Sequence, residues 1–168
     1  MTLLVDKLAA ALGEMERLYR QLADAETVRS DAIRQYDTEA LAEADGRCGR
    51  IAKAIEAADG LRRDAAAALG RSLGLPGSIR RPPRLLQIAE RLDGEPKQRL
   101  LGLHAVLRQR VEAVQERSSV NAAVTEKMLR HFHRLLSIVA GGGGQHKTYG
   151  ATGRLAPAAQ ARLVNQLA

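Results

Sequence analysis

Residues 141–148 read Gly-Gly-Gly-Gly-Gln-His-Lys-Thr, which superficially resembles a phosphate-binding loop. Such a loop has the spacing G-x-x-x-x-G-K-[ST], and it follows a strand and opens a helix so that backbone N–H groups face the phosphates. Here His146 occupies the place of the second required glycine, and the glycines follow an expected helix. The segment therefore does not predict a nucleotide site.

The histidines, the cysteine and the carboxylates do not form a recognisable reactive centre either. His131 and His133 are two residues apart, which on a helix directs them about 200° apart, whereas a helical metal pair needs a spacing of about four. His104 lies far from both, and the single Cys48 excludes an intramolecular disulfide and a multi-cysteine metal site. No carboxylate pair neighbours a histidine or serine that it could assist. We expect no enzymatic activity, no metal and no cofactor.

Positive charge is concentrated in the second half of the chain. The net charge is +7, and residues 71–168 carry 16 Lys and Arg against 6 Asp and Glu. A basic surface attracts nucleic acid or an acidic protein, but the stretch from Arg71 to Arg110 has no interleaved aromatic residue and matches no helix-turn-helix or zinc pattern. We expect no specific nucleic-acid binding. Because 21 of the 26 basic residues are Arg, codon bias is an alternative to a partner.

Composition predicts an all-α fold. Ala and Leu supply 53 of the 168 residues, whereas aromatic residues make up 2% and strand-forming residues are sparse. The chain has no apolar run near 18 residues, which predicts no membrane insertion. Its first residues lack the basic and apolar regions of a secretory signal, so we expect a cytoplasmic protein.

Apolar residues recur at steps of three and four, which predicts four helices over about residues 2–35, 38–72, 84–92 and 96–140. Asp37 is a good N-cap for the second helix, and Cys48 falls on its apolar seam, which favours a small core residue over a reactive thiol. Gly74, Pro76 and Gly77 end that helix. We predict an elongated antiparallel helical bundle, or coiled-coil hairpin, over residues 1–140.

The last of these helices carries the longest apolar pattern, a near-heptad seam of about 40 residues. Its members are Leu100, Leu103, Leu107, Val111, Val114, Ser118, Asn121, Val124, Met128, Phe132, Leu135 and Val139. A helix of this length is one arm of a hairpin or coiled coil. Ser118 and Asn121 are polar where the seam expects apolar residues, which predicts either a register-fixing polar contact or a seam exposed to solvent at that point.

Residues 141–168 are expected to form a flexible C-terminal tail hinged at Gly141–Gly144. The tail contains Tyr149-Gly-Ala-Thr-Gly-Arg-Leu155, a turn-like sequence, and Pro157 can start a short helix with Leu163, Val164 and Leu167 on one side. These apolar residues are too few to fold alone, so we expect the tail to fold on a partner.

The layout resembles the flagellar export chaperone family typified by FlgN. The resemblance covers nearly the full chain, and its most specific part is the Tyr-Gly-x-x-Gly-Arg-Leu element after the glycines. It implies a cytoplasmic, non-enzymatic chaperone that binds hook–filament junction (hook-associated) proteins, shields their terminal helices and delivers them to the flagellar type III export gate. Family contacts concentrate in the C-terminal region, which implies that the partner-binding residues are Tyr149, Gly153, Leu155, Leu163, Val164 and Leu167.

Two other classes of protein stay open: a basic helical protein associated with nucleic acid, and a purely structural coiled coil. A structural coiled coil has no need for a glycine-hinged turn motif, which favours the chaperone. Binding to DNA would weaken steeply with salt. The sequence leaves open which client is bound and whether the chain self-associates.

Overall fold

The computed structural model describes residues 1–141, with side chains up to residue 139. Four helices form this part of the chain: α1 (Thr2–Gln35), α2 (Thr38–Ser72), α3 (Leu85–Glu90) and α4 (Gly94–Gly141). Residues 1–141 contain no strand, so the predicted all-α fold is confirmed. The third helix is shorter than the predicted 84–92, and the fourth begins two residues before the predicted residue 96.

The chain divides into two compact units. The first, Met1–Ala122, contains α1, α2, α3 and the part of α4 up to residue 122. The second begins at Ala123 and contains the remainder of α4. Residues 142–168 lie outside the described residues, so the predicted division between a bundle over residues 1–140 and a tail over residues 141–168 stays a prediction.

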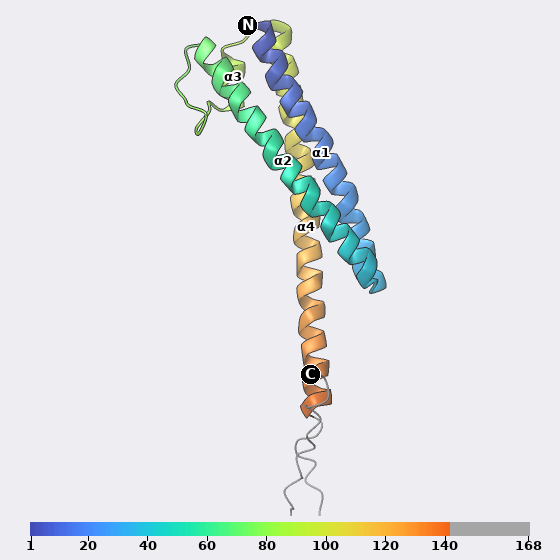
Figure 1. The fold of residues 1–168 in the computed structure, drawn as a ribbon. Helices are drawn as coiled ribbons and strands as arrows, with labels where there is room; N and C mark the ends of the chain where they lie inside the picture. Colours follow the sequence, from blue (N-terminus) through green and yellow to red (C-terminus); the bar gives the residue numbers. More distant parts are fainter. Residues whose placement is uncertain (142–168) are drawn as a thin grey trace, which may run out of the picture. The chain divides into compact units, whose positions relative to one another are not determined.

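In the first unit, α1 and α2 form an antiparallel hairpin with a tight connection (Figure 1). Tyr36 ends α1 in the left-handed conformation, with φ of 57°. Asp37 then caps α2, as the sequence predicted, because its Oδ1 accepts hydrogen bonds from the backbone N–H groups of Glu39 and Ala40. The cap satisfies backbone donors that would otherwise lack partners at the start of the helix.

The connection between α2 and α3 is fixed by a close contact of backbone and ring. Gly74 turns the chain out of α2 with φ of 69°. Pro83 is buried and packs on Gly70 so closely that a Cβ built there would lie 2.4 Å from the proline Cγ. The structure therefore requires glycine at residue 70, although that residue is inside a helix.

Within the first unit, α4 runs parallel to α1. In three contacts between them, the residue numbers rise in the same order on both helices. Arg99 Nη1 lies 2.7 Å from Asp6 Oδ1, Arg110 pairs with Glu16, and Asn121 contacts Glu26. The core between the helices is aliphatic, and its fully buried large side chains are Leu8, Leu69, Ile88 and Leu100. Burial of each such side chain contributes about 1.5–3 kcal/mol, so this core stabilises the first unit.

Candidate functional site: the exposed apolar face of α4

Every seventh residue of α4 from Leu100 onward belongs to one side of the helix. In the first unit this side is packed: Leu100, Leu107, Val114 and Asn121 are all buried. The repeat has the period of a coiled-coil seam, in which a seven-residue spacing keeps the same side facing the partner helix. Residues of α4 up to 121 therefore use the seam for internal packing.

Asn121 is the polar member of the packed seam, and it is almost fully buried. Its Nδ2 donates to the backbone carbonyl of Glu26 at 3.0 Å and to Glu26 Oε2 at 2.8 Å. Glu26 is buried as well, and Arg29, whose Nη1 is 3.6 Å from Oε2, links it to Asp45. Of the two alternatives that the sequence left open, the structure shows the polar contact and not a solvent-exposed seam at this residue.

In the second unit the same repeat reaches the surface. Met128 is half-buried, and Leu135 is 44% exposed. Phe132, the single phenylalanine of the chain, is 57% exposed, and Leu129 and Leu136 are exposed beside it. A contiguous group of exposed large apolar side chains on one helix face is typical of an interaction surface. We call the set Val124, Met128, Leu129, Phe132, Leu135, Leu136 and Val139 the α4 face.

The α4 face is broader than the seam of a two-stranded coiled coil. At 100° per residue, the seven side chains of the α4 face cover an arc of about 140° around the helix axis, with Val124 at one edge and Leu129 at the other. A two-stranded seam uses only two residues in seven. A face of this width can be covered by two helices, or by the groove between them.

The other side of the same segment is basic. Lys127, Arg130 and Arg134 point nearly opposite to the α4 face at 100° per residue, and Glu126 pairs with Arg130. The segment 123–139 therefore carries two more positive than negative charges. It is an amphipathic helix with an apolar face and a cationic back.

The site residues predicted from the sequence have different outcomes. Tyr149, Gly153, Leu155, Leu163, Val164 and Leu167 lie outside the described residues, so their role as partner-binding residues stays a prediction. Cys48 is half-buried and not fully inside the core, and burial, with Glu26 nearby, raises the pKa of its thiol. In the described part of the chain no three His, Cys, Asp or Glu side chains gather as a metal site would require.

Sequence reasoning placed five residues of the α4 face on the seam but neither Leu129 nor Leu136, and it did not assign any of the seven to partner binding. Helix length is the signal that could have done so. The expected helix over 96–140 is about ten residues longer than the helices over 2–35 and 38–72, which equals about 15 Å at 1.5 Å per residue. An apolar seam that is longer than the other helices of the chain is either covered by another molecule over part of its length or exposed there.

The fold is all-helical over the described residues, and the second unit exposes an apolar helix face. A family model, that of the FlgN protein, matches residues 1–157, and the chain belongs to this family. The resemblance inferred from the sequence is thereby confirmed, and membership supports a chaperone role in flagellar assembly. No curated protein and no solved structure shows significant similarity to the chain. Among the helices of residues 1–141, none is both long and apolar enough to cross a membrane.

Proposed function

We propose that this chain is a cytoplasmic flagellar export chaperone that binds hook–filament junction proteins through the α4 face and delivers them to the export gate. Family membership supports the class of protein. The observation that carries the site is the exposure of large apolar side chains along residues 124–139 of α4, in the same seven-residue repeat that is buried up to Asn121.

The client surface that fits this face is a pair of amphipathic helices. The family resemblance implies that such a chaperone shields the terminal helices of junction proteins, and these are the helices to which we assign the α4 face. Docking them on the α4 face would bury Phe132 and Leu135, which are exposed in the second unit. The client would thereby bury apolar surface that otherwise favours aggregation.

Electrostatics would assist the encounter with the client. The cationic back formed by Lys127, Arg130 and Arg134 lies away from the docked helices, so it would act as a long-range field and not through direct charge pairs. Such a field increases the rate of association with acidic partners and disfavours basic ones. We expect client binding to weaken only modestly with salt because most of its free energy is apolar.

The C-terminal segment would add a second contact. Tyr149, Leu155 and Leu163 are the residues to which we assign gate or client recognition, on the basis of the family resemblance and their apolar character. Two linked contacts raise the apparent affinity of a chaperone for a client without new contacts on either one.

The proposal is tested by titrating a purified junction protein into the full chain and into point variants, with calorimetry as the readout. Leu135→Ala removes a large side chain from the α4 face. Because burying a leucine is worth about 1.5–3 kcal/mol, we expect the dissociation constant to rise about 10- to 100-fold. Tyr149→Ala tests the C-terminal contact in the same titration.

Val106→Ala is the matched control, because Val106 is also 44% exposed and lies on the same helix, outside the α4 face. It should bind the client as wild type does. Equal weakening by Val106→Ala and Leu135→Ala would contradict the assignment of the site. Undiminished binding by Leu135→Ala and reduced binding by Tyr149→Ala would place recognition in the C-terminal segment instead.

A further inference from the structure

Positive charge gathers at the connection between α2 and α3, in the first unit. Residues 65–89 contain four arginines and no Asp, Glu or Lys, whereas residues 38–64 of α2 carry six acidic and five basic residues. Figure 1 shows the connection looping out beside α2 and α3. We call six exposed residues of this region the arginine patch, and they are Arg71, Ile79, Arg80, Arg81, Arg84 and Leu86.

The arginines of the patch have no ion-pair partner among the described residues. Other arginines of α2 have one, since Arg62 and Arg63 both pair with Asp59, at 2.8 and 3.0 Å. Codon bias can account for arginine in place of lysine, but it does not account for the lack of acidic neighbours. The patch is therefore a local excess of positive charge, which attracts an anionic partner.

A packed backbone holds two of these arginines near each other. The Pro83 ring lies against Gly70 and also against Gly77, where a Cβ would lie 2.9 Å from the proline Cδ. Arg71 directly follows Gly70, and Arg84 directly follows Pro83. The contact of the proline with the last turns of α2 therefore brings together an arginine of α2 and the arginine that precedes α3.

The other two arginines belong to a tight turn that also carries an apolar side chain. Ser78 and Arg81 exchange two backbone hydrogen bonds, at 3.0 and 3.1 Å, which leaves Ile79 and Arg80 at the tip of the turn. Ile79 is 54% exposed, and Leu86 in α3 is 50% exposed. The patch therefore offers ionic and apolar contacts to the same partner.

We propose that the arginine patch binds an acidic segment of another protein, in which carboxylates flank a large apolar side chain. Guanidinium groups bind carboxylates through two parallel hydrogen bonds, and a backbone that is already folded lowers the entropic cost of aligning several such pairs. The apolar side chain of the segment would contact Ile79 or Leu86. The proposal goes beyond the chaperone function and does not depend on the α4 face.

Nucleic acid and an anionic membrane fit the patch less well than an acidic protein segment does. Residues 65–99 contain no Phe, Tyr or Trp on which a base could stack. A phosphate backbone also offers no apolar group to Ile79. A protein that lies on a membrane inserts a broad apolar face, whereas the patch contains two exposed large apolar side chains.

Fluorescence anisotropy of a labelled acidic peptide tests the proposal. The probe is fluorescein-labelled Gly-Glu-Glu-Leu-Glu-Glu-Gly, titrated with the full chain at about 0.15 M salt, where exposed charges more than about 8 Å apart are largely screened. We expect a dissociation constant on the order of tens of micromolar, because exposed ion pairs are individually weak. Replacing the glutamates of the probe by glutamine should abolish binding, and replacing its leucine by serine should weaken binding about threefold.

Arg80→Gln/Arg84→Gln is the test variant, and Arg47→Gln/Arg50→Gln in α2 is its matched control. All four arginines are exposed and have no ion-pair partner among residues 1–139, so each double variant removes two positive charges and both should melt as wild type does. The test variant should raise the dissociation constant of the acidic peptide about tenfold, whereas the control should change it less than about twofold. Ile79→Ala should raise it about threefold.

Equal weakening by the two double variants would overturn the proposal, because binding would then follow net charge and not the patch. Absence of peptide binding, or undiminished binding of the glutamine peptide, would overturn it too. A labelled single-stranded DNA pentanucleotide, which also carries four negative charges, and phosphatidylserine vesicles are titrated in parallel. If either bound more tightly than the acidic peptide and lost binding in the test variant, the partner would be nucleic acid or a membrane, and the proposal would be wrong.

Discussion

The buried Asn121 amide donates to both the backbone carbonyl and the carboxylate of Glu26, two residues that are 95 positions apart in the sequence. This contact fixes the alignment of α4 against α1 near the end of the first unit. A buried carboxylate is costly without donors. The pair therefore acts as a register clamp, since sliding α4 by one turn would leave Glu26 without its amide partner.

Removal of the clamp should destabilise the first unit. Asn121→Ala leaves the Glu26 carboxylate and carbonyl with one donor fewer, and a hydrogen bond to a charged group is worth about 1.5–3 kcal/mol. We expect a loss of about that size in the free energy of unfolding, measured by urea denaturation. Ser118→Ala, at the half-buried seam residue three positions earlier, should change it by less than about 0.5 kcal/mol. Equal effects of the two substitutions would contradict the clamp.

Glycines inside the helices give opposite predictions according to their surroundings. At Gly49 and Gly102 a Cβ would meet nothing within 4 Å, so replacement by alanine should stabilise the protein by about 0.5–1 kcal/mol each. At Gly70 the Cβ would collide with the buried Pro83 ring, and alanine should destabilise by about 1–3 kcal/mol. Thermal melts of the three variants check the signs. Stabilisation by Gly70→Ala would show that Pro83 does not hold the connection.

Cys48 should react slowly with alkylating agents near neutral pH. Burial raises the pKa of its thiol, and the carboxylate of Glu26 adds to this effect, so less of the reactive thiolate is present at a given pH. The rate of alkylation in the folded protein should therefore follow a pH profile shifted upward from that of the urea-unfolded chain. If alkylation of the folded protein rose at lower pH than that of the unfolded chain, the result would contradict this account.

Residues 145–168 should contribute to binding and not to the stability of the helices. Because the described core lies within residues 1–139, a chain that ends at residue 144 should melt within a few degrees of the full protein. Its affinity for client or gate should be lower. A large drop in melting temperature on truncation would indicate that the C-terminal segment packs on the helices.

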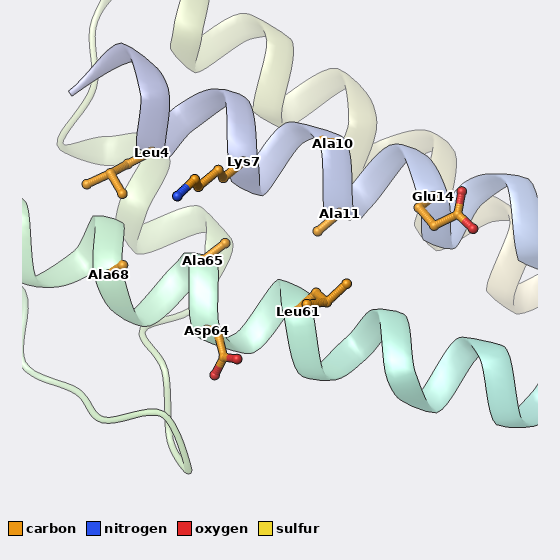
Figure 2. A pocket seen from close by; sticks show the side chains of 9 residues that line it. All are labelled: Leu4, Lys7, Ala10, Ala11, Glu14, Leu61, Asp64, Ala65 and Ala68. Atoms are coloured by element: carbon orange, nitrogen blue, oxygen red, sulfur yellow. The ribbon is translucent and has the colours of Figure 1, made fainter.

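Local chemistry made much of the fold predictable. The Asp37 cap depends on residues within three positions of it, and the helices follow from apolar spacing that needs no tertiary information. The partner of Asn121 was not predictable, because the sequence shows a polar seam residue but not which of many distant side chains it meets. The apolar groove between α1 and α2, lined by Ala10, Ala11, Ala65 and Ala68 among others (Figure 2), was not predictable for the same reason. The alanines of the two helices resemble ordinary helix-forming residues until the hairpin brings them side by side.

Secretion of junction proteins tests the central claim, the chaperone function, most directly. In the bacterium that encodes this chain, its gene is deleted and the hook–filament junction proteins exported to the medium are measured by immunoblot, with the hook protein as an internal control. Export of the junction proteins should fall sharply, while export of the hook protein is unchanged. The wild-type gene should restore export of the junction proteins, whereas a gene with Phe132→Ala/Leu135→Ala should not. Undiminished export of the junction proteins without the gene would contradict the account.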